Sequence, residues 1–235
     1  MPELQLIKET IENEFPKRKV AIIIPTHNNL KWLKQTINSI FLTTDYPHYR
    51  ILIIESESTD GTKEYLELLK QEYPEKIEIF NIIKEGSIKA CNFGLMQLEE
   101  NEDAYLTQDD VMFYPYRDWL KDYVTYAERK DAGVITSCGA GISGSSYIDG
   151  LIWVGSWDMY ITNQALQKIG IFDVNMQIGE DIDYAYRLRK EGLNIINFND
   201  PVTIVHHQRR ETHHAIQSEE LKRKNEQYFR EKHKL

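Results

Sequence analysis

Short apolar runs and amphipathic segments alternate regularly over the first half of the chain. Four runs rich in Ile, Leu, Tyr or Phe have the pattern of strands buried on both faces; they are residues 20–24, 50–54, 77–83 and 105–107. Segments with the apolar periodicity of helices follow the first three runs, at about 29–42, 62–72 and 90–98. This alternation predicts right-handed crossovers and an α/β fold with a mostly parallel sheet flanked by helices.

The second half of the chain is less regular. Helices are predicted at 116–130, near 163–169 and from 179–183 to Gly192. Strands are predicted at 133–137, 152–154 and 193–198, and the Gly- and Ser-rich stretch 139–150 reads as a mobile loop. A short amphipathic helix is expected at 3–14, before Pro16, and a charged tail from Gln208 is expected to be helical near its end.

Polar residues gather where the four predicted strands of the first half end. Ligands of open parallel sheets bind at the carboxyl ends of the strands, so these turns are expected to lie on one rim; they follow Ile24, Ile54, Ile83 and Thr107. The last turn carries Gln108, Asp109 and Asp110. Neighbouring carboxylates repel each other unless a cation neutralises them, and Mg²⁺ or Mn²⁺ prefers oxygen ligands. An acidic turn facing water is the alternative, but the convergence of four turns favours a site.

Composition and short motifs argue against several classes of protein. The net charge of −9 argues against a general nucleic-acid binder, whose affinity would need a basic surface. The two cysteines, Cys91 and Cys138, form neither a disulfide framework nor a metal-ligand spacing, which favours a reducing cytoplasm. No apolar run has transmembrane or signal-peptide length, so a soluble protein is expected, with a basic tail (Lys222 to Lys234) as the part that would meet a membrane surface. The first turn lacks the Gly-rich fingerprint of a dinucleotide-dependent oxidoreductase.

In order and spacing, these segments resemble glycosyltransferase family 2, whose enzymes are inverting and have the GT-A fold. The resemblance runs from about Val20 to His207. The residues that carry it are Pro25-Thr26-His27-Asn28, Ser58-Thr59-Asp60-Gly61-Thr62, Gly86, Ala90, Asn92, Gly94, Asp109-Asp110, Gly170-Ile171-Phe172-Asp173, Glu180-Asp181-Ile182-Asp183, Arg187, Gly192 and His206. The resemblance implies a single GT-A domain over 1–235 with a Rossmann-like sheet. About 20–110 would bind the nucleotide, about 111–207 would form a smaller, partly antiparallel acceptor side, and 208–235 would be a helical tail.

The resemblance also implies a metal-dependent reaction. Asp110 is the expected ligand of Mn²⁺ or Mg²⁺, supported by Asp109 or Gln108, and His206 completes the metal or diphosphate contacts, with His207 as the alternative. Asp181 is the expected general base and Glu180 the second choice. A carboxylate at a helix N-terminus is favoured as the anion, so Asp181 is expected to stay ionised. Helix capping is the alternative role of both residues.

The donor is expected to be a nucleotide sugar, UDP- or dTDP-linked, because a carboxylate after the second strand can accept from the ring N–H of uracil or thymine. The residues expected to hold the nucleotide are Pro25, Thr26, Asn28, Glu55, Glu57, Asn92, Gln108 and Asp109. The acceptor is expected to be a hydroxyl of a glycan or of a lipid-linked sugar, in polysaccharide synthesis.

Three positions depart from the family pattern. Glu55-Ser56-Glu57 stands where the family has Asp-Asp or Asp-Asn, Cys91 stands where many members have Arg, and Gln108 replaces the first Asp of the metal motif. These departures favour the alternative hypothesis of a GT-A-fold protein that binds nucleotide sugars or glycans but has lost catalysis. A sugar nucleotidyltransferase would need a Gly-rich basic loop after the first strand, which 25–30 does not provide.

Overall fold

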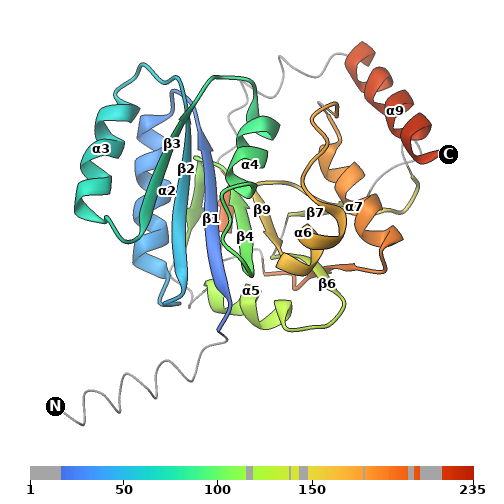
Figure 1. Ribbon diagram of the computed structural model, residues 1–235, viewed down its shortest axis with the longest axis horizontal. Coiled ribbons are helices and arrows are strands. Elements are labelled where there is room, and N and C mark those ends of the chain that lie inside the picture. Colours follow the sequence, from blue (N-terminus) through green and yellow to red (C-terminus); the bar gives the residue numbers. More distant parts are fainter. Residues whose placement is uncertain are drawn as a thin grey trace, which may run out of the picture.

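A computed structural model describes residues 17–114, 119–137, 139–142, 148–176, 178–200, 204–206 and 219–235. Its main sheet has seven strands in the order β10-β6-β9-β4-β1-β2-β3. All neighbouring pairs are parallel except those of β9, which runs antiparallel to both β4 and β6. Helices cover both faces of this sheet (Figure 1). The predicted α/β fold with a mostly parallel sheet is confirmed.

The first half follows the predicted alternation closely. Its elements are β1 (Lys19–Thr26), α2 (Leu30–Thr43), β2 (Tyr49–Ser56), α3 (Thr62–Glu72), β3 (Ile77–Ile82), α4 (Ser87–Leu95) and β4 (Glu102–Thr107). The Ile-rich run of β1 is fully buried, because alternate side chains enter two separate cores. Ile22 packs with α2 on one face and Ile23 packs with α4 on the other. A Cβ on Gly94 would lie 2.5 Å from Ile23, so this glycine lets α4 approach the sheet closely.

The second half contains β5 (Val111–Phe113), α5 (Trp119–Ala127), β6 (Ala132–Thr136), β7 (Ala140–Ile142), β8 (Ile152–Val154), β9 (Asp158–Ile161), α6 (Asn163–Ile169), α7 (Glu180–Lys190), β10 (Asn194–Asn197), β11 (Ile204–His206) and α9 (Glu219–His233). Helix α5 packs on the α2 side of the sheet, and α6 and α7 pack on the α4 side. Two small antiparallel pairs, β11 with β5 and β7 with β8, complete the predicted antiparallel part.

Three sequence-based expectations need correction in this half. Strand β9 was not predicted, because it is short and begins with Asp158, a residue type that strands usually exclude. The stretch 139–150 is not one loop, since Ala140–Ile142 forms β7. Strand β5 was not expected either. The helix expected at 3–14 lies outside the described residues, as do 115–118 of the helix expected at 116–130.

Asp158 explains why an acidic residue can begin a central strand. Its carboxylate is fully buried and accepts hydrogen bonds from the hydroxyls of Tyr105, Tyr123 and Thr136. The N–H and the hydroxyl of Ser137 and the N–H of Gly139 bind it as well. A carboxylate with this many donors can remain buried. Asp158 therefore holds the start of β9 against the ends of β4 and β6.

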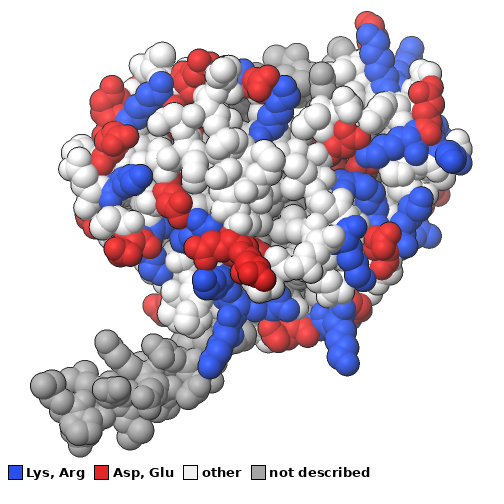
Figure 2. Space-filling view, in the orientation of Figure 1, with Lys and Arg blue, Asp and Glu red and all other residues white. Residues whose placement is uncertain are grey.

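Helix α9 packs against α7 at the end of the molecule opposite α3 (Figure 1). Phe229 is fully buried and lies 5.5 Å from the ring of Tyr186. Basic and acidic side chains are mixed over this end of the molecule (Figure 2), and exposed lysines of α9 pair with glutamates of the same helix. Over the described residues, no helix combines the length and the apolar character needed to span a bilayer.

Candidate functional site

The ends of β1, β2, β3 and β4 surround one cavity of about 390 Å³, together with the first turn of α4. The residues that line it are Pro25, Thr26, His27, Asn29, Ser56, Lys84, Gly86, Ser87, Ala90, Cys91, Gln108, Asp109, Asp110 and Ser156. All four turns that follow the strands contribute to this wall, so the predicted rim is confirmed. Of the expected site residues, the wall contains Pro25, Thr26, Gln108, Asp109 and Asp110.

Asp109 joins the turn after β4 to the turn after β1. Its Oδ2 accepts a 2.7 Å hydrogen bond from the Thr26 hydroxyl, and its Oδ1 accepts a 2.6 Å bond from the Asn29 side chain. Asn29 occupies the N-cap position of α2 but makes no capping hydrogen bond with its side chain, because that side chain points to Asp109 instead. Both donors are buried, so the carboxylate has a fixed orientation at the cavity wall.

Asp110 is buried to 5% exposure beside Asp109 and also lines the cavity. Two carboxylates and the amide oxygen of Gln108 form an oxygen donor set that fits a hard divalent cation. The described residues contain no group of three or more His, Cys, Asp or Glu side chains that could hold a metal ion. The fit is therefore to a cation that a diphosphate would share, since Mg²⁺ and Mn²⁺ are commonly bound by one or two carboxylates plus substrate phosphates.

His206 is placed near this acidic turn by its backbone. Strand β11 pairs with β5 so that His206 lies opposite Val111, the residue that follows Asp110. Its side chain, like the whole of His207, lies outside the described part of the chain. The strand register therefore agrees with a position next to the acidic turn, and the choice between the two histidines stays a prediction.

Asn28, Glu55 and Glu57 hold the turns after β1, β2 and β3 together rather than forming the cavity wall. Asn28 donates its N–H to the Ser58 hydroxyl at 2.9 Å. Glu55 is 1% exposed, and its Oε1 accepts from the Ser58 N–H at 2.5 Å. Glu57 Oε2 accepts from the Lys84 N–H at 3.1 Å. The structure thus gives both glutamates contacts with loop backbone, and their carboxylates are not part of the wall.

His27 and Lys84 line the cavity on the side of β2 and β3, and neither was among the expected site residues. The Nδ1 atom of His27 lies 2.5 Å from the Ser56 carbonyl oxygen, and Nε2 lies 2.8 Å from the Lys84 ammonium. Lys84 follows an edge strand and belongs to no motif. The only sequence signal was its position directly after the third strand, on the predicted rim.

Asn92 connects α4 to the turn that precedes α7. It is 3% exposed, donates to the Phe172 carbonyl oxygen at 2.8 Å and accepts from the Phe172 N–H at 3.0 Å. Its neighbour Cys91 lines the cavity. Burial, together with the nearby charge of Glu180, raises the pKa of the Cys91 thiol to about 12. The thiol therefore stays protonated.

Glu180 and Asp181 form the first turn of α7, after Gly179 in a left-handed conformation. Burial, and then the charge of Asp181, raises the pKa of Glu180 to about 8. Burial raises the pKa of Asp181 to about 6, against the N–H of Ile182, which donates to its Oδ1 at 2.8 Å. The helix N-terminus alone would favour ionisation of both groups. Burial thus opposes the helix N-terminus and raises both pKa values, that of Glu180 further than that of Asp181, so Asp181 is the more readily ionised of the two, as expected.

The next residues of α7 anchor this turn. Asp183 is fully buried and forms the expected ion pair with Arg187 at 2.8 Å. Arg187 also donates to the carbonyl oxygens of Ile169 and Ile171, and Asp183 accepts from Lys232 and His233 of α9 at 2.8 Å each. Arg187 and α9 thus position this helix, and its N-cap residue, Gly179, has no side-chain capping bond.

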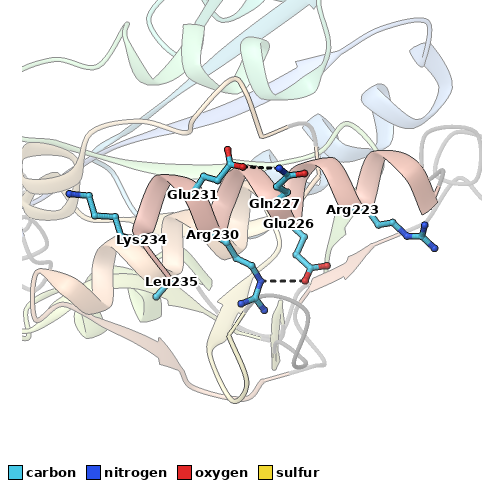
Figure 3. A pocket seen from close by; sticks show the side chains of 7 residues that line it. All are labelled: Arg223, Glu226, Gln227, Arg230, Glu231, Lys234 and Leu235. Atoms are coloured by element: carbon cyan, nitrogen blue, oxygen red, sulfur yellow. Dashed lines mark hydrogen bonds and ion pairs between the residues drawn. The ribbon is translucent and has the colours of Figure 1, made fainter.

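A second hollow lies along α9 itself (Figure 3). Its side chains bind one another: Arg230 donates to Glu226 and Gln227 donates to Glu231. The residues that line it come from α9 and from the two residues that follow it, Lys234 and Leu235. It therefore brings no catalytic groups from different elements together, unlike the cavity at the rim.

The sequence of this chain is similar to those of known glycosyltransferases. A sequence model described as glycosyl transferase family 2 matches residues 21–179. Over 211 residues the chain is 27% identical to the dolichyl N-acetyl-alpha-D-glucosaminyl phosphate 3-beta-D-2,3-diacetamido-2,3-dideoxy-beta-D-glucuronosyltransferase of Methanococcus voltae, a match that covers 75% of this chain and 63% of that enzyme. An uncharacterized glycosyltransferase of Rickettsia bellii is 29% identical over 96 residues, 41% of this chain and 14% of that protein. The chain thus spans less than two thirds of the length of these relatives.

Solved structures of glycosyltransferases are similar in fold to this chain. The mannosyltransferase PcManGT from Pyrobaculum calidifontis, in complex with GDP-Man and Mn²⁺, has a TM-score of 0.68 at 19% identity, covering 86% of this chain and 61% of that one. S. aureus TarS 1–349 in complex with UDP-GlcNAc has a TM-score of 0.65 at 18% identity, covering 85% and 61%. At these identities the similarity concerns the fold.

Proposed function

Because this chain belongs to glycosyltransferase family 2 and has the GT-A fold, we propose that it transfers a sugar, with inversion, from a nucleoside diphosphate sugar to a hydroxyl acceptor. One observation carries this proposal. A single cavity is lined by Asp109 and Asp110 at one side and by Cys91 at another, and the charge of Glu180, in the first turn of α7, acts on the Cys91 thiol. The turn proposed to hold the diphosphate through a cation and the helix turn that carries the proposed base thus both act on this cavity.

We assign Asp110 to a divalent cation, Mn²⁺ or Mg²⁺, with Gln108 beside it and His206 as a further ligand. A cation held there would stabilise the charge that develops on the departing diphosphate. Asp109 orients this turn through Thr26 and Asn29. The presence of Mn²⁺ in the mannosyltransferase complex supports this assignment by analogy of fold.

We assign Asp181 as the general base. With a pKa of about 6 it is ionised at neutral pH and still basic enough to accept a proton from an acceptor hydroxyl. The hydroxyl oxygen then forms a bond to the anomeric carbon while the bond from that carbon to the phosphate oxygen breaks. The proton stays on Asp181, and the nucleoside diphosphate leaves with the electron pair. Attack from the face opposite the leaving group gives inversion.

The remaining residues have positioning roles in this proposal. Pro25 and Thr26 border the nucleotide in the cavity wall. Asn28, Glu55, Glu57 and Asn92 set the turns around the nucleotide, in keeping with their contacts to Ser58, Lys84 and Phe172. Uridine and thymidine diphosphate sugars remain the expected donors, although neither Glu55 nor Glu57 is now proposed to bind the base.

The acceptor is proposed to be a hydroxyl of a glycan or a lipid-linked sugar, reached at the cytoplasmic surface. The name of the M. voltae relative specifies a dolichyl phosphate-linked acceptor for that enzyme, which supports the second form. Relatives of this family act in glycan and polysaccharide synthesis.

Release of nucleoside diphosphate from a panel of UDP-, dTDP- and GDP-sugars, with Mn²⁺ and with EDTA, tests the proposed activity. We expect release from one class of donor that requires Mn²⁺. Donor that binds without turnover under any condition, with or without added glycan acceptors, would favour the catalytically degenerate binding protein instead, with Gln108 and Cys91 as its distinguishing departures.

A further inference from the structure

The charged side chains of the rim cavity are separated by sign. Its carboxylates, Asp109 and Asp110, both follow β4. Among the described residues that line it, Lys84 is the one lysine or arginine, and it follows β3. The sheet order places β1 and β2 between these two strands, so three strand spacings of about 4.8 Å separate the two ends of the cavity. A diphosphate at Asp110 therefore leaves the β2 and β3 side to the base.

Lys84 is held in place by groups of two neighbouring turns. Its N–H donates to Glu57 at 3.1 Å, and its ammonium lies 2.8 Å from Nε2 of His27. An ammonium has no acceptor, so this contact requires an unprotonated Nε2. The ring proton of His27 is then on Nδ1, where it donates to the Ser56 carbonyl oxygen at 2.5 Å. This chain of contacts fixes the ammonium at the cavity rim and uses one of its three N–H donors.

The carboxylates that might have faced a base are engaged elsewhere. Glu55 is buried, accepts from the Ser58 N–H, and its other oxygen lies 3.8 Å from the ammonium of Lys63. Glu57 accepts from the Lys84 N–H. Neither belongs to the cavity wall, so the charged group that this side of the wall presents is a hydrogen-bond donor.

Resting on the proposed function, we propose that Lys84 determines base specificity and selects bases with a keto edge. The carbonyl oxygens of uracil (O4), thymine (O4) and guanine (O6) accept hydrogen bonds, and Lys84 can donate to them. Cytosine and adenine carry an amino group at the corresponding position, and two donors that face each other form no hydrogen bond, so the contribution of a charged donor to binding is lost. The site therefore favours uridine, thymidine and guanosine diphosphates over cytidine and adenosine diphosphates, at least about tenfold in Kd.

Titration of the chain of 235 residues with UDP, GDP, CDP and ADP in the presence of Mn²⁺ tests this specificity. The variants are Lys84→Met, Lys84→Glu and a control, Lys89→Met. Lys89 is also exposed, pairs with Glu85 and is not part of the cavity wall. We expect wild type and the control to bind UDP or GDP at least about tenfold more tightly than CDP and ADP. Lys84→Met should remove most of this preference, and Lys84→Glu should shift it toward CDP or ADP, because a carboxylate accepts from an amino group.

Other outcomes overturn the inference in distinguishable ways. An equal loss of affinity for all four nucleotides in Lys84→Met would assign Lys84 to the phosphates. An unchanged preference in both Lys84 variants, or a wild type that prefers CDP or ADP, would remove Lys84 from base recognition while leaving the proposed transferase intact. Failure of the wild type to bind any nucleotide, tested also as the UDP- and GDP-sugars, would overturn the proposed function together with this inference.

Discussion

The side chain of Asn29 donates a 2.6 Å hydrogen bond to Asp109, a residue 80 positions later in the sequence. Thr26 donates to the other oxygen of the same carboxylate. The turn after β1 and the turn after β4 are thereby fixed to each other at the wall of the cavity. The orientation of the proposed metal turn thus depends on residues of the first strand and its following loop.

Replacement of Asp109 should reduce both stability and nucleotide binding. Asp109→Ala leaves the buried donors of Thr26 and Asn29 without this acceptor, and an unsatisfied buried donor costs about 1–3 kcal/mol. We expect the free energy of unfolding to fall by about that amount in urea titrations. Asp149→Ala, on an exposed turn, is the control and should change it by less than about 0.5 kcal/mol. Equal stability of both variants would show that the Asp109 contacts contribute nothing.

The pH dependence of the reaction should report Asp181. If ionised Asp181 is the base, kcat/KM rises as the pH rises through about 6. Glu180→Gln should keep this rising limb, since Glu180 is protonated over that range. Asp181→Asn should lower kcat by 10²-fold or more, on the order of a general base contribution. A rising limb that disappears in Glu180→Gln while Asp181→Asn stays active would reverse the two roles.

Glu180 should also make the protein less stable at alkaline pH. Its pKa is raised in the folded state, so the folded protein binds more protons than the unfolded chain between the two pKa values. Stability therefore falls as the pH rises from about 4.5 to about 8. Glu180→Gln removes this ionisation, and its Tm should exceed that of wild type at pH 9 but not at pH 4. Equal Tm differences at both pH values would contradict the raised pKa.

Acid stability should depend on the attachment of α9. Lys232 donates to Asp173 and Asp183 at 2.8 Å each. Burial alone would raise the pKa of Asp173, but Lys232, Asn175 and Tyr228 lower it to about 2. Because this pKa is depressed on folding, its stabilising contribution is complete above the unfolded value near 3.8 and is lost as the pH falls toward 2.

Lys232→Met should therefore raise the pH at which the protein unfolds in acid, measured by far-ultraviolet circular dichroism. Lys224→Met, which removes an exposed pair with Glu220 on the same helix, should leave that pH nearly unchanged. If both variants unfold at the wild-type pH, α9 does not contribute to acid stability through Lys232.

Much of the nucleotide-binding half could be predicted from sequence, because the period of apolar residues there reports burial directly. Strand β1 is buried on both faces and reads as an unbroken apolar run, and α3 starts and ends where its periodicity does. Strand β9 could not be predicted in this way. Its first residue, Asp158, is an acid whose burial depends on donors from β4, α5 and β6, and no local pattern records such donors.

The candidate site also contains residues that local sequence predicts and residues whose roles depend on tertiary contacts. Asp109 and Asp110 were predicted from a motif at a strand end, and the structure places both in the cavity wall. Glu55 and Asn92 occupy family motif positions as well, yet their side chains bind Ser58 and Phe172 backbone groups. Lys84 belongs to no motif and depends on His27 for its position. Position along a strand can be predicted from sequence, whereas the partner of each polar side chain depends on tertiary contacts.

One measurement tests the central claim most directly. UDP and a UDP-sugar are titrated into wild type, Asp110→Ala and Asp181→Asn, each with Mn²⁺ and with EDTA. Turnover of the UDP-sugar is measured for the same three proteins. The proposed mechanism predicts that wild type binds only with Mn²⁺ and that Asp110→Ala loses this metal-dependent binding. Asp181→Asn should bind like wild type but lose turnover, because its carboxylate acts on the acceptor rather than on the donor. Metal-dependent binding that survives in Asp110→Ala, or full turnover in Asp181→Asn, would contradict it.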